Sequence, residues 1–503
     1  MSTERKSRLQ RGIGQRQLSM IAIGGAIGTG LFLASGNAIH DAGPGGALLA
    51  YGLMGLVVYC MMTSLGEMAT QLPIPGGFQA FASRFIDPAL GAAFGWNYWF
   101  SWAITLAAEF VAAAIIMQYW FPNVPGSLWA GIFFIFLMAL NLLSAKAFSE
   151  AEFWFAGIKV IAVLVFLFVG VLLIFGLTGD PAVGFGHWTE RSGSEQAPFV
   201  GGFGAILGVF LVAGFSFQGT EGVGLAAAEA HDPAKTIPKA IRSVFWRILI
   251  FYIGAIFVIG TLVPFTDPNL LGGSVEDVSM SPFTIVFMRA GFQSAASIVN
   301  AIILTAVLSC GNSSLYMASR MIYAMSLNRQ APRCFDKVNR RGVPYLAVWI
   351  TGAVGALACL TTFVGVDRIY EIFYNASGQT GFIIWLGIAM AHYRFRRAWI
   401  AQGRTLNDLK YRSKFYPVGP FLAMALSLLV IFGANYFVFL DFNWPDLFIY
   451  YGFFPAFMLI YLGFKFKRRT KLVRLTDCDF AMPGEGEFSG AHEAPGGNRK
   501  DKD

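Results

Sequence analysis

Long apolar stretches separated by short polar segments recur along almost the whole chain. A helix that crosses a bilayer needs about 20 mainly apolar residues. Twelve stretches meet this length, and they lie at 18–40, 46–71, 92–120, 127–147, 153–177, 200–228, 244–265, 282–308, 344–364, 371–392, 416–438 and 447–467. Membrane strands would instead alternate apolar and polar positions and would be far less hydrophobic. The pattern therefore predicts an all-α polytopic membrane protein with twelve transmembrane helices.

The composition of the chain agrees with this prediction. Of its 503 residues, 56% are hydrophobic and only 13% are charged, whereas soluble proteins are about 25% charged. A soluble fold of this composition would expose large apolar patches, which excludes a soluble enzyme, a nucleic-acid-binding domain and a disordered scaffold. The 5 cysteines and 5 histidines are dispersed, so we expect no disulfide framework, no metal site and no cofactor.

The positive charges predict the orientation of the chain. Lysine and arginine cluster in both tails and between spans 6 and 7, 8 and 9 (where we expect Arg320), and 10 and 11. The opposite face carries only Arg191, Arg289 and Arg368. Cytoplasmic segments collect such residues, so both termini are expected in the cytoplasm. The formal net charge of +8 then reflects orientation and contact with anionic membrane lipid, and no nucleic-acid partner is expected.

Two glycine-rich stretches look unfavourable for plain helices. They are GGAIGTG at 24–30 in span 1 and GFSFQGTEGVG at 214–224 in span 6. Each glycine weakens a helix by about 1 kcal/mol relative to alanine, so each cluster predicts a break; close helix packing through small residues is the alternative. Interrupted helices at matching positions in two halves are typical of transporters built from inverted repeats.

The two breaks, five spans apart, predict the division of the chain. We expect a five-plus-five inverted repeat with broken helices 1 and 6, in which spans 1–5 and spans 6–10 are the two halves. Spans 11 and 12 would be two additional C-terminal helices. The expected segments are a cytoplasmic N-terminus (1–17), the first half (18–177), the second half (200–392), the two additional helices (416–467) and a cytoplasmic, disordered tail (468–503). The helix after the N-terminus is expected to be retained rather than cleaved as a signal.

Broken membrane helices free backbone groups that can bind a zwitterion. Amides at the start of a half-helix point toward anions, and freed carbonyls point toward cations. The candidates to receive a carboxylate through their amides are Ile27, Gly28, Thr29 and Gly30. The residues whose carbonyls are placed to receive an ammonium are Phe215, Phe217 and Gln218.

Ionisable residues inside spans are costly, from about 2.5 kcal/mol upward at a helix centre. Those in or beside the predicted spans are Glu67, Glu109, Lys159, Glu221 and Glu229. Each of three glutamates could instead have a purely structural role: Glu67 at a helix end, Glu109 within the bundle, and Glu229 at the membrane edge. Lys159 lies too far from either end of its span to snorkel easily. It is either part of a fixed lysine–glutamate bridge or a proton-driven charge switch that replaces a sodium ion.

Aromatic residues are dense in the third span. Tyr98 and Trp102 are four residues apart and share one helix face. Packing or an interfacial belt explains most such residues. If they face a site, they can enclose an aliphatic chain and contact a cation through a ring face.

Together these motifs resemble the amino acid–polyamine–organocation superfamily, and within it the bacterial lysine-specific permeases, over roughly residues 16–475. The stretches that carry the resemblance are LSMIAIGGAIGTGLF (18–32), GWNYWFSW (95–102), EAEFWFAGIKV (150–160), the segment 214–252 that begins GFSFQGTEGVG, SPFT (281–284), LTAVLSCGNSSLYMASRMIY (304–323) and AHYRFRRAW (391–399).

The resemblance implies the five-plus-five fold, alternating access and proton symport. It implies that Gly28, Thr29 and Gly30 bind the substrate backbone and that Lys159 stands where related carriers hold sodium. It further implies that Glu221 and Glu229 serve binding or proton coupling, and that Tyr98 and Trp102 line a lysine site. Glu109 stands where lysine permeases carry an aspartate, and its role stays open.

We therefore predict a proton-coupled secondary active transporter that imports L-lysine across the bacterial inner membrane, with Glu221 or a nearby acid opposite the substrate side chain. A monomer is compatible with the sequence. One alternative is a permease of the same fold for aromatic amino acids, arginine or GABA. A membrane enzyme would need clustered histidines or paired acids near one face, and no nucleophile–base pair is evident. A receptor that binds without transport is a third alternative.

Overall fold

Every regular element that the structure describes is a helix. The computed structural model describes residues 28–32, 34–143, 145–178, 181–189, 197–227, 232–267, 270, 281–291, 295–360, 366–440 and 442–482. No strand occurs in these ranges. Seven of the described helices are long and apolar enough to cross a membrane, or eight if one bent pair forms a single span. The predicted all-α polytopic character is confirmed, whereas twelve helices and the inverted repeat stay predictions.

The first two predicted spans meet in one kinked helix. Helix α3 (Ala34–Gln71) contains Gly43 with φ 72° and ψ 170°, followed by Pro44. This kink lies where the sequence predicts the boundary between spans 1 and 2. A side chain at Gly43 would place its Cβ 2.5 Å from the Pro198 carbonyl oxygen, so only glycine fits both the positive φ and the close approach.

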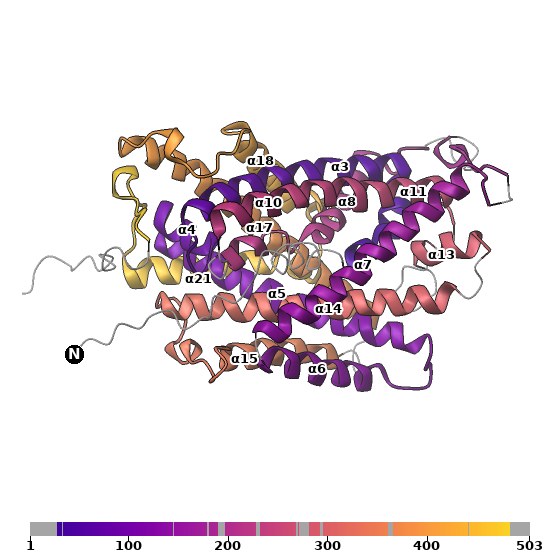
Figure 1. The fold of residues 1–503 in the computed structure, drawn as a ribbon, viewed down its shortest axis with the longest axis horizontal. Coiled ribbons are helices and arrows are strands. Elements are labelled where there is room, and N and C mark those ends of the chain that lie inside the picture. The colour runs from indigo at the N-terminus through magenta and orange to yellow at the C-terminus, as the bar shows by residue number, and fades with distance from the viewer. Residues whose placement is uncertain are drawn as a thin grey trace, which may run out of the picture.

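Helix α5 (Pro88–Gln118) forms the centre of the bundle (Figure 1). The Asp87 side chain caps its first turn by accepting a hydrogen bond from the Ala89 amide at 2.8 Å. The helices that pack around α5 include α6 (Gly126–Leu143), α14 (Ala295–Leu327), α15 (Tyr345–Gly355), α17 (Val366–Ala401) and α21 (Phe453–Arg468). Nearly all of α5 is therefore shielded from lipid, and its polar side chains face other helices.

The remaining helices complete the bundle around this centre. They are α2 (Thr29–Phe32), α4 (Phe78–Phe85), α7 (Ala145–Ile174), α8 (Gly202–Phe217), α9 (Gly222–Ala226), α10 (Pro233–Arg247), the π-helix η4 (Ile248–Ile253), α11 (Gly254–Leu262), α13 (Pro282–Arg289), α18 (Val418–Gly433), α19 (Phe437–Leu440) and α20 (Trp444–Tyr451). The short 3-10 turns are Gly186–Trp188, Arg333–Asp336, Ala356–Leu360, Leu406–Asp408 and Leu475–Asp477.

The break predicted in the sixth span is present. Helix α8 ends at Phe217, and α9 begins at Gly222 after a four-residue turn. Gly219 adopts φ 93° in this turn. Gly214 is helical and allows close packing, since a Cβ there would lie 2.1 Å from the Phe382 ring. The glycine cluster therefore has both of the roles considered from the sequence: a helix break at 218–221 and close helix packing beside it. Of the other cluster, residues 24–27 lie outside the described residues.

The eighth predicted span differs from the structure. The sequence predicts a span over 282–308, but Pro282–Arg289 forms the short helix α13 and the long helix α14 runs from Ala295 to Leu327. Arg320 therefore lies inside a helix rather than in a loop. Its guanidinium carbon lies 4.5 Å from the centre of the Tyr316 ring. The hydropathy pattern missed the second half of α14 because its polar side chains face other helices rather than water.

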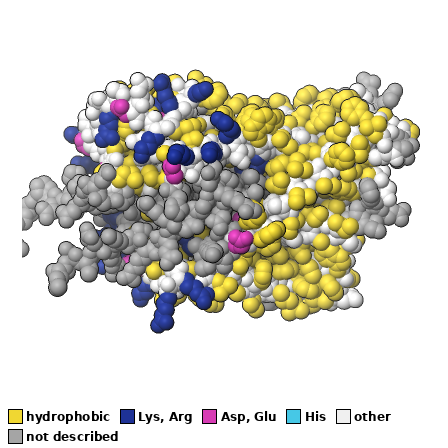
Figure 2. Space-filling view, viewed as in Figure 1, with side chains coloured by type: hydrophobic (Ala, Val, Ile, Leu, Met, Phe, Trp, Pro, Cys, Tyr) yellow, Lys and Arg dark blue, Asp and Glu magenta, His cyan; other side chains and the backbone are white. Residues whose placement is uncertain are grey.

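The surface is divided by charge. Figure 2 shows lysine and arginine gathered at one end of the molecule and apolar side chains over much of the remaining visible face. In the view of Figure 1 the cationic end contains α4 and the end of α21. Exposed large apolar side chains such as Phe168, Phe203 and Phe448 suit a surface that contacts lipid.

The segment 469–482, here called the tail segment, is packed against the cationic end of the bundle. The Phe480 ring lies 5.2 Å from the Phe85 ring of α4 and 5.0 Å from the Trp399 ring of α17. The Val473 amide donates to the Ile86 carbonyl at 2.8 Å. The predicted disorder of 468–503 is therefore wrong for the tail segment. The tail as a whole is polar, and this composition masks the few apolar residues near its start, such as Phe480, that are buried against the bundle.

We expect Phe480→Ala to detach the tail segment and expose Cys478. Burial raises the pKa of the Cys478 thiol to about 11, and the thiolate is the reactive form. Truncating a buried phenylalanine costs about 3–5 kcal/mol in protein cores, and about 1.4 kcal/mol changes a population tenfold. Maleimide labelling of Cys478, followed by mass spectrometry, should accelerate about tenfold or more.

Leu472→Ala is the matched control, because Leu472 is 59% exposed whereas Phe480 is 8% exposed. Its labelling rate should equal that of the parent protein. Equal rates in Phe480→Ala and Leu472→Ala would show that the Phe480 contacts do not hold the segment.

Candidate functional site

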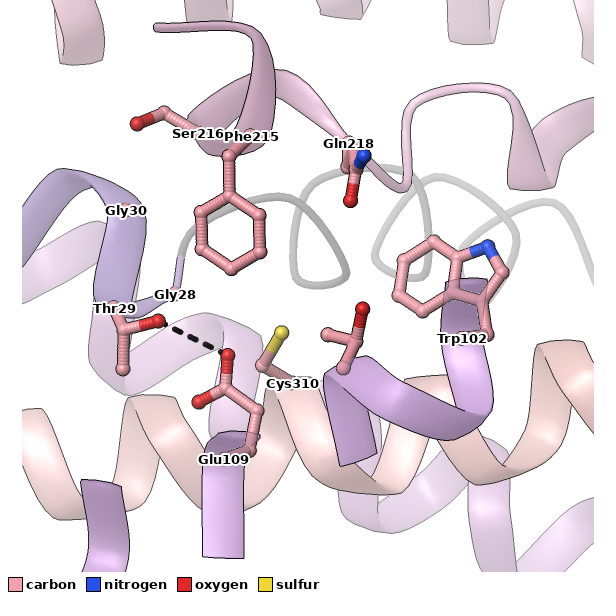
Figure 3. Close-up of a pocket in the computed structure, with 10 residues that line it drawn as sticks. Gly28, Thr29, Gly30, Trp102, Glu109, Phe215, Ser216, Gln218 and Cys310 are labelled. Carbon is pink, nitrogen blue, oxygen red and sulfur yellow. Dashed lines mark hydrogen bonds between the residues drawn. The ribbon is translucent and has the colours of Figure 1, made fainter. Parts of the chain in front are cut away.

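A cavity of about 260 Å³ lies where α2, α5, α8 and α14 converge (Figure 3). Much of this space is open solvent between the side chains, and the part closed off by the protein has room for about one water molecule. The surrounding helices would have to move apart to admit an amino acid. The described residues that line it are Gly28, Thr29, Gly30, Trp102, Thr105, Glu109, Phe215, Ser216, Gln218 and Cys310.

Glycine lets α2 lie directly against its neighbours. A Cβ at Gly30 would lie 2.7 Å from the Cα of Ser216 on α8, and one at Gly28 would lie 3.1 Å from the Sγ of Cys310 on α14. The first intrahelical bonds run from the Leu31 and Phe32 amides to the Gly28 carbonyl. The preceding amides belong to the first turn of α2, whose amides have no partner within the helix itself. Gly28, Thr29 and Gly30 line the cavity, and their binding of a carboxylate stays a prediction. Ile27 lies outside the described residues.

The end of α8 forms another wall. The Phe215 ring projects into the cavity, and the Gln218 side chain lies at the break (Figure 3). The Gln218 amide nitrogen donates to the Ser377 carbonyl at 2.8 Å, and the Ser377 hydroxyl donates to the Gln218 oxygen at 3.1 Å. This reciprocal pair fixes the break to α17.

Two carbonyls near the break already have donors. The Phe215 carbonyl accepts from the Gln218 backbone amide at 3.1 Å. The Ser216 carbonyl accepts from the Tyr252 hydroxyl at 2.9 Å. A carbonyl has a second lone pair, so each of these two could still accept a hydrogen bond from an ammonium. The ammonium would then share each carbonyl with the donor already present.

Glu109 occupies the wall opposite Phe215. It rises from α5 and accepts a hydrogen bond at Oε1 from the Thr29 hydroxyl at 3.1 Å (Figure 3). Its side chain is buried, and its Oε2 has no hydrogen-bond partner in the described part of the chain. The sequence left the role of this residue open. The structure makes it the one carboxylate among the described residues that line the cavity.

The predicted aromatic pair is divided between the cavity and the layer behind it. Trp102 lines the cavity. Tyr98 does not: its hydroxyl donates to the Met317 sulfur at 3.3 Å, and its ring packs against Phe78 at 4.8 Å and Trp102 at 5.9 Å. Tyr98 therefore supports Trp102 from behind.

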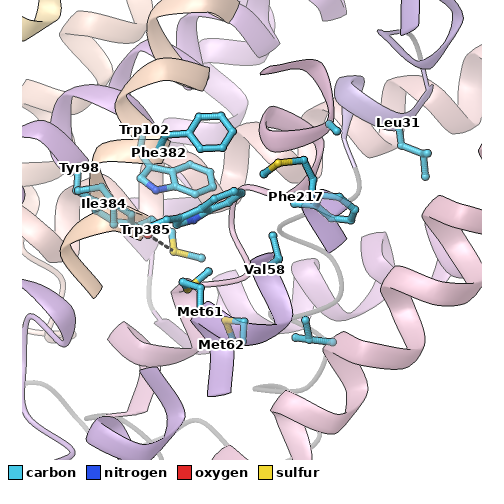
Figure 4. Close-up of a cluster of buried hydrophobic side chains, with 14 of the residues drawn as sticks. Leu31, Val58, Met61, Met62, Tyr98, Trp102, Phe217, Phe382, Ile384 and Trp385 are labelled. Atoms are coloured by element: carbon cyan, nitrogen blue, oxygen red, sulfur yellow. Dashed lines mark hydrogen bonds between the residues drawn. The ribbon is translucent and has the colours of Figure 1, made fainter. Parts of the chain in front are cut away.

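Phe217 is not among the described residues that line the cavity, and the predicted binding of an ammonium by its carbonyl stays a prediction. Its ring is fully buried and packs against Tyr252 at 4.4 Å and Tyr51 at 6.0 Å. It belongs to a cluster of buried apolar side chains that includes Val58 (Figure 4).

Glu221 fastens the break rather than lining the cavity. Its Oε1 accepts from the Gly219 amide at 3.3 Å, and its Oε2 accepts from the Trp385 indole at 3.4 Å. Both oxygens are thus bonded within the break and to α17. The other predicted acid of this region, Glu229, lies outside the described residues.

Lys159 is fully buried on α7, within a cluster of charges. The acids that act on it electrostatically are Glu152 and Glu109, and Arg247 is a neighbouring cation. Glu152 accepts from the Ser309 hydroxyl at 2.7 Å and the Asn312 amide at 3.3 Å. The sequence analysis missed Glu152, although its spacing of seven residues from Lys159 places both on one helix face.

Other lining residues were also missed. Thr105, Ser216 and Cys310 carry little sequence signal, because small polar residues are common in membrane helices. One signal was available: Trp102, Thr105 and Glu109 follow the three- and four-residue spacing of a single helix face. The Thr105 and Ser377 hydroxyls lie 2.6 Å apart, which links α5 to α17 beside the cavity.

The sequence also matches known proteins over nearly its whole length. Residues 17–476 match the family described as amino acid permease. The lysine-specific permease LysP of Escherichia coli (strain K12) is 49% identical over 475 residues, which cover 94% of this chain and 96% of that protein. LysP of Lactococcus lactis subsp. cremoris is 47% identical over 484 residues, covering 95% and 94%. The histidine permease HisP of the same organism is 44% identical over 478 residues, covering 95% and 99%.

Gly30→Ala should weaken the folded protein by forcing α2 away from α8. The added Cβ would meet the Ser216 backbone at 2.7 Å, and such overpacking costs about 1–3 kcal/mol. The Tm of the detergent-solubilised protein should fall. Gly157→Ala on α7 is the control, since its Cβ would meet nothing within 4 Å; its Tm should stay unchanged or rise. Equal Tm values for the parent and Gly30→Ala would contradict the close contact.

Proposed function

This chain belongs to the amino acid permease family, and from that premise we propose that it imports L-lysine together with a proton across a bacterial inner membrane. It is a multi-pass membrane protein and an amino acid permease, a transporter rather than an enzyme. Two relatives that match almost its whole length are named lysine-specific permeases. The observation that carries the proposal is the cavity between the start of α2 and the break after α8.

The substrate backbone is held by main-chain groups in this proposal. Its carboxylate meets the amides at the start of α2, around Gly28, Thr29 and Gly30, because such amides have no partner within the helix. Trp102 and Phe215 offer apolar surface to the methylene groups of the side chain. Glu221, behind Gln218, is the acid proposed to offset the side-chain ammonium, which is costly to leave unpaired in a low dielectric.

Transport proceeds by alternating access of a twelve-helix, five-plus-five inverted repeat. The break at 218–221 supports one of the two interrupted helices of this pattern. The other is proposed at 24–30, of which residues 24–27 lie outside the described residues. Direct contact of α2 with α8 at Gly30 and Ser216 makes the site sensitive to rocking of one half against the other. The cationic end in Figure 2 faces the cytoplasm, together with both termini and the anionic lipid surface.

Proton coupling is assigned to Lys159, with Glu221 and Glu229 as further proton carriers. A charged ammonium is costly to bury, so the protonation of the fully buried Lys159 depends on the charges around it. The electrostatic link from Lys159 to Glu109 connects this charge to the cavity. Protonation of Lys159 then biases closure around the substrate.

A permease of the same fold for another amino acid is the second candidate. HisP, at 44% identity, bears the name of a histidine permease, and RocE of Bacillus subtilis, at 40% identity, is named only as an amino-acid permease. The family and the fold therefore do not by themselves select lysine over arginine, aromatic amino acids or GABA.

Uptake of labelled lysine by purified protein in liposomes tests the proposal. An inward pH gradient should drive lysine accumulation, and excess unlabelled lysine should abolish it. Phenylalanine and GABA should compete weakly or not at all. Stronger competition by arginine, histidine, phenylalanine or GABA than by lysine would assign the cavity to that solute. Absence of any counterflow would favour a receptor.

Lys159→Ala should reduce gradient-driven accumulation to the level reached without a gradient, because the switchable charge is lost. Lysine exchange at equal pH should persist, which also shows that the variant is folded. Lys239→Ala replaces an exposed lysine of α10 and should accumulate lysine normally. Gradient-driven accumulation by Lys159→Ala at the parental level would remove Lys159 from proton coupling.

A further inference from the structure

Glu109 has unused acceptor capacity inside the cavity. Its side chain is 2% exposed, and Oε1 accepts the Thr29 hydroxyl. Oε2 has no hydrogen-bond partner among the residues the structure describes. A buried carboxylate oxygen without a donor is costly. The position therefore calls for a donor that enters the cavity.

The other acids buried within the described helices are already engaged. Glu67 accepts both arms of the Arg396 guanidinium at 2.6 Å and the Ser413 amide at 2.7 Å. Glu152 and Glu221 each accept two hydrogen bonds, as described above. Only Glu109 among these four combines an unbonded oxygen with a place on the cavity wall.

We propose that Glu109 holds the α-ammonium of the substrate. This inference rests on the proposed binding of the substrate carboxylate at the start of α2. The Thr29 hydroxyl fixes Glu109 beside that turn, and a Cβ at Gly28 would lie 3.6 Å from Glu109 Oε1. An α-amino acid carries its ammonium on the carbon next to its carboxylate. A substrate bound at these amides therefore brings its α-ammonium to the Glu109 end of the cavity.

The alternative acceptors are weaker. The carbonyls of Phe215 and Ser216 are neutral and already accept one donor each. An ammonium forms charge-assisted hydrogen bonds with carbonyls as well as with carboxylates, so hydrogen bonding alone does not favour Glu109. A desolvated ammonium, however, also needs a counter-charge, which a carbonyl dipole does not supply. Glu109 supplies it, and the carbonyls complete the coordination.

The assignment separates the roles of two acids. Glu109 recognises the part that all α-amino acids share, whereas Glu221, whose oxygens already accept from Gly219 and Trp385, would meet the side-chain ammonium only by sharing these donors. Besides the substrate α-ammonium of this proposal, the Lys159 side chain also acts electrostatically on Glu109. The substrate α-ammonium and Lys159 thus compete for one carboxylate, which gives substrate binding a direct effect on the proposed proton switch.

Glu109→Gln tests the inference through two competitors of labelled lysine counterflow at equal pH. The first is lysine, and the second is 6-aminohexanoate, which keeps the carboxylate and the terminal ammonium but lacks the α-ammonium. In the parent protein lysine should compete far better. In Glu109→Gln the apparent Kd for lysine should rise about tenfold or more, whereas that of 6-aminohexanoate, titrated up to high millimolar concentration, should not rise.

Two further variants act as controls. Glu109→Asp keeps the charge and should retain more lysine affinity than Glu109→Gln. Glu150→Gln alters an exposed acid of α7 and should leave both values unchanged. The Tm of each variant reports folding.

Three outcomes would overturn the inference. The lysine Kd of Glu109→Gln could stay within twofold of the parent value, which would confine Glu109 to proton coupling or structure. Lysine and 6-aminohexanoate could weaken equally, which would place the terminal ammonium at Glu109. Glu109→Asp could be no better than Glu109→Gln, which would remove the need for charge. Absence of lysine counterflow in the parent protein would instead defeat the proposed function.

Discussion

The structure depends on satisfying backbone groups that a broken helix releases inside a membrane. Lipid offers no hydrogen bonds, so these groups must find partners within the protein. At the break after α8, side chains supply some of them: Glu221 accepts from the Gly219 amide, and the Tyr252 hydroxyl donates to the Ser216 carbonyl. The Gln218 side chain exchanges hydrogen bonds with Ser377 of α17. The break is thus fastened to α17 on one side and left open toward the cavity on the other. A substrate can use only the groups that this internal bonding leaves free.

The buried charges follow the same division. Glu67 and Arg396 form a fully bonded pair near the cationic end of the bundle, which suits a fixed joint between α3 and α17. Glu109 lies instead on the cavity wall, where its Oε2 has no hydrogen-bond partner among the described residues, and Lys159 acts on it electrostatically. Breaking a satisfied pair costs several kcal/mol, whereas an incompletely satisfied charge lowers the cost of admitting a new partner. The Glu67–Arg396 pair therefore stabilises the fold, whereas Glu109 leaves an acceptor available for a ligand.

The sequence predicted the break of the sixth span and the glycines of α2, because glycine clusters are rare in apolar helices without a reason in backbone geometry. It also predicted the buried lysine, since a charge in the middle of a span is visible in one dimension. It could not show which of Tyr98 and Trp102 lines the cavity, because helix rotation depends on contacts with other helices. It missed the second half of α14 because polar residues there are buried by neighbours distant in the sequence. It missed the packing of the tail segment because Cys478 and Phe480 are buried there among mostly polar, exposed residues.

The position of Glu109 explains how a single site could respond to two cations. Its carboxylate is bonded to Thr29 of α2, lies on α5 in the centre of the bundle, and is within the field of Lys159 on α7. Any cation that changes the position or charge of this carboxylate therefore changes the support of α2. Since α2 touches α8 through Gly30 without an intervening side chain, that change reaches the break directly. Under the proposed function, substrate recognition and proton coupling then share one contact between α2 and α5, and the substrate side chain is read elsewhere in the cavity.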